Sequence, residues 1–185
     1  MSLPETQSLV LRGVTFAPAL FAAPMAGITH SAFRRLLADY GGYGALWSEM
    51  LSARMLKGDD LERSPWLKRR PAEGKVIYQL MVADPEGLAE GVARLATLRP
   101  DGLDLNTSCP APNIRKQQGG AHLFEDAGRL REVTAELRRC WTGPLTAKIR
   151  LGRPGEDWRE RLLERVRVLA EAGVDALVVH PRFAD

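Results

Sequence analysis

The sequence is poor in cysteine and has no long hydrophobic run. Its only cysteines, Cys109 and Cys140, do not stand at a paired spacing. This argues against a disulfide framework, favours a reducing compartment and leads us to expect no metal site. No apolar stretch approaches the roughly 18 residues of a membrane span, and the N-terminus lacks the pattern of a signal peptide. We therefore predict a cytoplasmic protein without a membrane-spanning helix.

Lysine is also scarce: five Lys stand against 21 Arg, and the formal net charge is only +3. Arginine binds phosphates and bases better than lysine does, so this composition permits a nucleic-acid partner. A compositional bias of the genome would produce the same excess of arginine, and the charge alone decides nothing. The length of 185 residues and the 45% hydrophobic content suit one domain with one core.

A glycine-rich dinucleotide fingerprint is missing, because Ala26-Gly27-Ile28 follows the first predicted strand instead. What is present is a regular alternation of strand and helix patterns. Helices are expected to begin at Thr29 as N-cap, with Phe33, Leu36, Leu37 and Tyr40 on the apolar face, and at Asp84 as N-cap before Pro85. Strands are predicted at residues 21–25, 45–50, 75–80, 102–105, 145–151 and 176–179.

A strand–helix repeat of roughly 30 residues is typical of the eight-fold parallel barrel. The predicted fold class is therefore α/β, a TIM (β/α)8 barrel that is incomplete here, with about six βα units and a chain that stops after the sixth strand. A doubly wound open sheet is the competing architecture. We assign residues 1–16 to an N-terminal leader and residues 17–185 to the N-terminal portion of the barrel, without its remaining strands or any C-terminal helical domain.

The stretch from Asp101 to Gly120 carries the strongest functional signal. The strand at 102–105 runs into Asn106-Thr107-Ser108-Cys109-Pro110, a polar elbow that would deliver an amide and a thiol to the C-terminal end of the strand. Parallel barrels build their active sites at that end. A lone cysteine is more often a small buried hydrophobe, so Cys109 has a structural as well as a catalytic interpretation.

Two cations interrupt the apolar strand at 145–151. Lys148 and Arg150 lie two residues apart and so share one face of that strand. A pair of cations at a barrel mouth suits an electron-rich partner such as a flavin ring, a nucleobase or a phosphate. The alternative is an edge strand from which Lys148 reaches water. His180, at the end of the sixth strand, has both a structural and a functional interpretation.

Taken together, six stretches resemble the tRNA-dihydrouridine synthases. They occur in the family's order: APMAGITHSAFRRL, YQL, DLNTSCP with the later GGAHLFED, AKIRLG and VHPR. The resemblance covers about residues 17–182. The resemblance implies an FMN-dependent flavoprotein with a TIM-barrel fold and RNA-binding activity. Such an oxidoreductase reduces the C5=C6 bond of uridine in tRNA, with NADPH or NADH as electron donor.

The resemblance also implies roles for single residues. Hydride would pass from N5 of the flavin to C6 of uracil, and Cys109 would protonate C5 as general acid. The uridine must first leave its stack in the folded RNA. The FMN-binding residues would be Pro24, Met25, Ala26, Gln79, Lys148 and His180. The substrate-binding or ring-orienting residues would be Asn106, Arg150 and Arg182.

Two other functions remain open from the sequence. A dihydroorotate or dihydropyrimidine dehydrogenase-like FMN barrel places a similar N-x-S-C-P element after its fourth strand and acts on a free pyrimidine. A barrel fragment that binds RNA without catalysis is the third possibility. The APMAG stretch and the position of Arg150 after Lys148 favour the tRNA enzyme. No oligomeric state is predicted.

Overall fold

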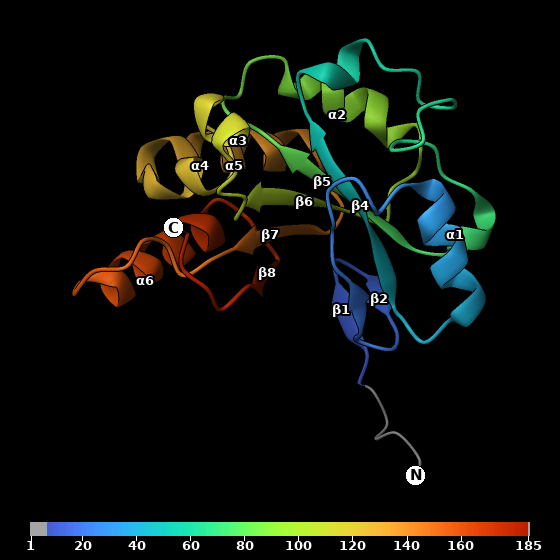
Figure 1. Cartoon of the computed structure of the whole chain (residues 1–185), viewed down its shortest axis with the longest axis horizontal. Coiled ribbons are helices and arrows are strands. Elements are labelled where there is room, and N and C mark those ends of the chain that lie inside the picture. The colour runs from blue at the N-terminus through green and yellow to red at the C-terminus, as the bar shows by residue number, and fades with distance from the viewer. Residues whose placement is uncertain (1–6, 185) are drawn as a thin grey trace.

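Six parallel strands follow one another in the order of the chain, in a computed structural model that describes residues 7–184 (Figure 1). A doubly wound sheet reverses its strand order at a switch point, so this sequential order excludes that alternative. The sheet curls, and its helices lie on the outer side (Figure 1). The strands are β3 (Phe21–Ala22), β4 (Ala45–Ser52), β5 (Val76–Met81), β6 (Gly102–Thr107), β7 (Leu145–Ile149) and β8 (Ala176–Val179).

The predicted incomplete barrel is therefore confirmed. Within the described residues, β3 and β8 each pair on one side only, which leaves the barrel open between them. The helices are α1 (Ser31–Tyr40), α2 (Leu88–Ala96), α3 (Pro112–Lys116), α4 (Ala121–Glu125), α5 (Ala127–Cys140) and α6 (Trp158–Glu171), with the short turns η1 (Met55–Lys57) and η2 (Pro71–Glu73). No helix within residues 7–184 is long and apolar enough to cross a membrane.

Alternation along the strands separates an apolar outer face from an inner face that is polar toward the C-terminal ends of the strands. Tyr78 and Leu80 of β5 belong to the main core, together with Leu103 and Leu105 of β6. Side chains of α2, α5 and α6 complete that core, among them Leu95, Leu137 and Leu169. Because successive side chains of a strand point to opposite faces, the residues between them point into the barrel. The inner face is where the polar side chains of the strands gather.

The N-terminal segment contains a β-hairpin that the sequence analysis did not anticipate. Residues 1–16 were assigned to a leader, but β1 (Leu9–Leu11) pairs antiparallel with β2 (Val14–Phe16). Phe16 is fully buried and packs with Trp47 and Ile77 near the N-terminal ends of the barrel strands. Strands of three residues are too short to show a clear hydrophobic period. Residues 1–6 of the predicted leader lie outside the described residues.

Both predicted helix starts are corrected. The N-cap of α1 is His30, whose Nδ1 accepts a hydrogen bond from the Phe33 N–H, because Thr29 turns back and bonds the backbone of Met25 instead. The cap of α2 is Gly87 rather than Asp84. Gly87 adopts a left-handed conformation (φ 70°), which glycine tolerates without strain. Asp84 accepts a hydrogen bond from the Glu86 N–H in the preceding turn.

We expect the isolated 185-residue chain to self-associate and to melt over a broad temperature range. The open edges of β3 and β8 offer unpaired backbone groups, and a cavity of about 300 Å³ is lined by apolar side chains of the hairpin and the strand starts. Light scattering at increasing protein concentration and thermal melting followed by circular dichroism would check this. A sharp melt of a monomer at every concentration would show that closure of the barrel is not needed.

Candidate functional site

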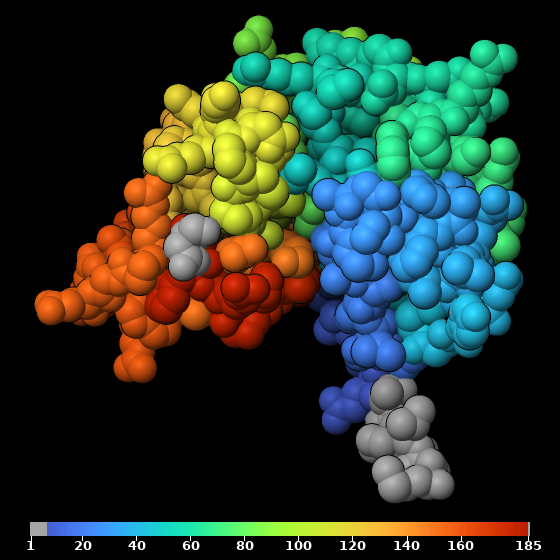
Figure 2. Space-filling model, viewed as in Figure 1, coloured from blue at the N-terminus to red at the C-terminus, as the bar shows by residue number. Residues whose placement is uncertain are grey.

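One cavity gathers most of the predicted functional residues at the C-terminal ends of the strands. This strand-end cavity has a volume of about 160 Å³. In the space-filling view, a hollow separates the N-terminal part of the chain (blue) from the C-terminal part (orange and red) (Figure 2). The lining residues are Pro24, Ala26, Met50, Gln79, Asn106, Ser108, Cys109, Pro110, Lys148 and Arg150.

Strand register explains why these side chains meet. Gln79 of β5 is the neighbour of Asp104 on β6, and Asp104 is the neighbour of Thr146 on β7. One layer nearer the C-terminal ends, Asn106 is paired with Lys148. These side chains all point into the barrel, because they occupy alternate positions of parallel strands in register. Register therefore brings polar side chains of β5, β6 and β7 together on one face of the sheet.

The elbow after β6 is held by its own asparagine. Asn106 Oδ1 accepts hydrogen bonds from the backbone N–H of Ser108 at 3.1 Å and of Cys109 at 3.0 Å. The carbonyl of Cys109 accepts from the Ala121 N–H at 3.0 Å. Gly120 allows this close approach, since a Cβ there would lie 2.5 Å from the Cys109 carbonyl oxygen. The half-buried Cys109 is thus fixed through its backbone, and its thiol is left free to face the cavity.

A buried acid lies directly beneath this elbow. Asp104 is fully buried and accepts hydrogen bonds from Gln79 Nε2 at 2.8 Å and from Thr146 Oγ1 at 2.5 Å. Gln79 Oε1 in turn accepts from Asn106 Nδ2 at 2.8 Å. Burial raises the pKa of Asp104 to about 6, against the opposing effect of its hydrogen bonds with Thr146 and Gln79. Two predicted cavity residues, Gln79 and Asn106, are therefore linked by hydrogen bonds to a carboxyl group that is shielded from water.

The cations of the cavity belong to β7 and to the residues that follow it. Partial burial lowers the pKa of Lys148, while Asp104 raises it and Arg150 lowers it. Arg150 Nη1 donates to the Phe183 carbonyl at 2.9 Å, and its buried Nε has no partner among the described residues. Lys148 has no hydrogen bond from its ammonium group to another described side chain. Both groups thus retain donors for an electron-rich ligand, which fits the predicted chemistry.

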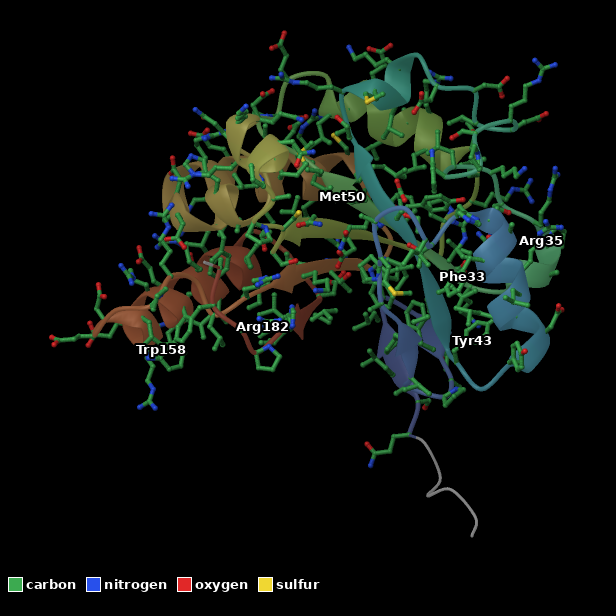
Figure 3. The ribbon with its side chains drawn as sticks, viewed as in Figure 1. Phe33, Arg35, Tyr43, Met50, Trp158 and Arg182 are labelled. Atoms are coloured by element: carbon green, nitrogen blue, oxygen red, sulfur yellow. The ribbon has the colours of Figure 1, made fainter. Side chains whose placement is uncertain are left out.

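Three predicted residues do not line the strand-end cavity. Met25 is 38% exposed, and its backbone N–H donates to Thr29 Oγ1. Arg182 is exposed beyond the end of β8 (Figure 3). His180 is half-buried; partial desolvation lowers its pKa, and the nearby cations Lys148, Arg150 and Arg182 act in the same direction. The structure therefore places His180 within the electrostatic reach of the site but not in its wall.

A second and larger cavity opens on the other side of the elbow. This loop cavity has a volume of about 370 Å³, and Cys109 and Pro110 line both cavities. Two buried atoms beside it, His122 Nδ1 and Glu125 Oε1, have no hydrogen-bond partner among the described residues. The larger cavity does not hold the strand-end amides and Lys148. Its remaining lining residues are Arg115, Ala121, His122, Glu125, Arg153, Pro154 and Ala184.

Asp104 and Thr146 were not among the residues that the sequence predicted for the site. An acidic residue in the middle of a short apolar strand was a visible signal, because an unpaired buried carboxylate is costly and so requires partners. Thr146 gave no signal, since threonine is common in strands. His122 and Arg153 lie in segments whose proximity to Cys109 depends on the tertiary fold. Within residues 7–184, no cluster of three or more His, Cys, Asp or Glu side chains could hold a metal ion.

Comparison with known proteins gives a consistent match. A family model described as "Dihydrouridine synthase (Dus)" matches residues 21–185. The chain is 36% identical over 175 residues to a tRNA-dihydrouridine(16) synthase of Cupriavidus necator, covering 90% of this chain and 53% of that protein. It is 31% identical over 172 residues to a probable tRNA-dihydrouridine synthase of Treponema pallidum, covering 88% and 49%. The chain spans about half the length of the curated relatives it matches.

Solved structures of low sequence identity share the fold. A 2,3-dimethylmalate lyase of the PEP mutase/isocitrate lyase superfamily aligns with a TM-score of 0.55 at 11% identity, covering 87% of this chain and 56% of that one. A putative phosphonomutase from Burkholderia cenocepacia aligns with the same TM-score at 23% identity, covering 86% and 67%. At this level of identity the likeness concerns architecture alone, because one fold hosts many unrelated activities.

Proposed function

Because the chain belongs to the dihydrouridine synthase family, we propose that it is the catalytic-barrel portion of a flavin-dependent enzyme that reduces uridine in tRNA. It spans about half of its relatives' length, so the complete activity is a property of the whole enzyme. The observation that carries the proposal is the meeting of Gln79, Cys109 and Lys148 in one cavity at the strand ends. We further propose that the enzyme works in the cytoplasm with NADPH or NADH as reductant.

The strand-end cavity has the donors that an isoalloxazine ring would need. Lys148 supplies a cation, Gln79 has a second Nε2 hydrogen that is not used by Asp104, and Arg150 has a buried Nε without a partner. When bound, FMN would supply the hydride, whose chemistry belongs to the cofactor. We assign FMN contacts to Pro24, Met25, Ala26, Gln79, Lys148 and His180.

On the substrate side, Cys109 is the proposed proton donor to C5 of uracil. Its thiol stands between the two cavities, so a pyrimidine beside it would have Lys148 and Gln79 on one side and the loop cavity on the other. Arg115 and Arg153 give the loop cavity the positive charge that an RNA backbone attracts. We assign substrate contacts to Asn106, Arg150 and Arg182.

A single experiment separates this function from the alternatives. The purified full-length enzyme should carry a flavin absorbance, and its reduced flavin should be oxidised by unmodified tRNA but not by free orotate. Oxidation by orotate alone would identify a free-pyrimidine enzyme instead. A protein that binds tRNA but neither carries nor takes up FMN would be a binding barrel. Position 16, for which several relatives are named, is the first tRNA position to assay.

Replacing Lys148 by alanine should weaken FMN binding by roughly tenfold or more, since hydrogen bonds to charged groups contribute about 1.5–3 kcal/mol. Titration of the apoenzyme with FMN, followed by flavin fluorescence, measures the effect. Lys57→Ala is the matched control, because Lys57 forms a surface ion pair with Glu90 and lies outside the strand-end cavity. Equal FMN affinity of the two variants would remove Lys148 from the cofactor site.

A further inference from the structure

We propose that Asp104 is a positioning residue that sets the direction of the Gln79 and Asn106 amides and, through them, the conformation of the Cys109 elbow. The chain of hydrogen bonds is continuous: it leads from Thr146 and Asp104 on the inner face to the backbone N–H groups of the elbow. The positioning role does not depend on which substrate the enzyme uses. Its functional meaning rests on the proposed role of Cys109.

The direction of each amide is fixed by chemistry from both ends of the chain. At the elbow, the backbone N–H groups of Ser108 and Cys109 can only donate, so the Asn106 atom facing them must be its oxygen. The nitrogen of Asn106 then faces Gln79, which must accept through its own oxygen. That leaves the Gln79 nitrogen toward Asp104.

At the other end, the carboxylate of Asp104 can only accept hydrogen bonds when ionised. It therefore requires the nitrogen of Gln79, at 2.8 Å, and the hydroxyl of Thr146. The two ends of the chain independently demand the same orientation of Gln79. The Gln79 amide itself could be turned either way, because its oxygen and nitrogen have nearly the same shape. With the opposite orientation, however, it would satisfy neither Asp104 nor the Asn106 nitrogen.

Burial makes this series of hydrogen bonds costly to break. Asp104 and Thr146 are at most 4% exposed, and Gln79 and Asn106 are at most 5% exposed. In such surroundings an unsatisfied polar group loses its hydration without compensation. The same orientation also decides what Gln79 offers to the strand-end cavity, namely its second N–H and the free lone pair of its oxygen.

An exchange of acid and amide between positions 104 and 106 tests the proposal. In Asn106→Asp, the new carboxylate oxygen faces Gln79 Oε1, and two acceptors then stand opposite each other without a hydrogen. If the Gln79 amide turns over, its oxygen faces the carboxylate of Asp104 instead, so the same conflict arises there. In Asp104→Asn, the chain survives, because the new amide can accept from Gln79 and donate to the Thr146 hydroxyl. In the double variant the Gln79 amide turns over, and each hydrogen bond from Thr146 to the elbow can form again. The double variant also keeps the number of carboxylates unchanged.

The readout is the rate at which iodoacetamide alkylates Cys109 in the full-length enzyme without FMN, in a Cys140→Ser background. We expect Asn106→Asp to raise this rate about tenfold, because the elbow is then held less firmly. A tenfold change corresponds to the lower part of the free-energy range that an unsatisfied buried polar group costs. Asp104→Asn and the double variant should stay within about twofold of the parent. The proposal is overturned if Asn106→Asp matches the parent, or if adding Asp104→Asn brings no recovery. If Asn106→Asp does not fold, recovery of folded protein in the double variant supports the proposal, and its failure to recover overturns it.

FMN titration of the same variants separates this inference from the proposed function. The double variant restores the elbow but presents Gln79 to the cavity in the opposite direction, so we expect FMN to bind it at least several-fold more weakly than the parent. Unchanged FMN affinity with a restored thiol rate would remove Gln79 from the cofactor contacts, and the positioning role of Asp104 would stand on the thiol data.

Discussion

Replacing Cys109 by alanine should slow the oxidation of reduced enzyme flavin by tRNA about 10²- to 10⁴-fold, the range that general acid catalysis contributes. FMN binding and flavin reduction by NADPH should be unchanged, because neither step uses the thiol. The substitution is mild for the fold, since the hydrogen bonds that hold the elbow use the Cys109 backbone N–H and carbonyl. Single-turnover oxidation of the pre-reduced enzyme with tRNA measures the effect directly.

Two further variants complete this experiment. Cys109→Ser keeps the size of the side chain but offers a much weaker acid, so it should behave like alanine. Cys140→Ala should react like the parent, because Cys140 ends α5, where its thiol contacts Glu136 and lines neither cavity. A wild-type rate for Cys109→Ala would show that the thiol only packs, and another group would have to protonate the substrate.

The sequence alone was sufficient to predict the barrel and to bring most of the candidate residues to its strand ends. The strand–helix period predicted parallel strands in chain order, and alternation within a strand placed Lys148 and Arg150 on one face. Parallel topology then brings the strand ends together whatever the details of packing. Seven predicted residues accordingly share the strand-end cavity: Pro24, Ala26, Gln79, Asn106, Cys109, Lys148 and Arg150.

The contacts among those residues could not be predicted in the same way. The direction of the Gln79 amide depends on groups from three strands, and register between strands is set by tertiary packing. The helix caps could not be predicted either. Thr29 and Asp84 are good N-cap residues by type, yet the side chain of each forms its hydrogen bond within the turn before the helix. Local preference gives way where a neighbouring backbone group offers a competing partner.

The clearest departure concerns α1, whose buried face is not its apolar one. Phe33, Leu36 and Tyr40 were expected to face the core, but Leu36 is 52% and Tyr40 82% exposed. Phe33, labelled in Figure 3, is only half-buried. The helix instead buries Ser31 and Arg34 completely. The amphipathic spacing gave the wrong buried face, because spacing alone does not show that an arginine is buried with partners from distant loops.

Those partners enclose Arg34 on every side. Its Nε donates to Glu73 Oε2 at 2.7 Å, and both side chains are fully buried. Its Nη atoms donate to the carbonyls of Thr29 at 2.7 Å and Lys68 at 2.8 Å. Glu73 also accepts from the Ser31 hydroxyl. The pair thereby ties α1 to the segment that leads from η1 into β5.

We expect Arg34→Met to lower the free energy of unfolding by about 3–5 kcal/mol, because it leaves the Glu73 carboxylate buried without its cation. Urea denaturation of the full-length enzyme, followed by tryptophan fluorescence, measures the loss. Arg35→Met is the matched control: Arg35 is the next residue of α1 (Figure 3), is exposed, and forms no ion pair within residues 7–184. Adding Glu73→Leu to Arg34→Met should recover part of the stability, since it removes the stranded charge. If Arg34→Met proves no more costly than Arg35→Met, the buried ion pair does not hold α1 in place.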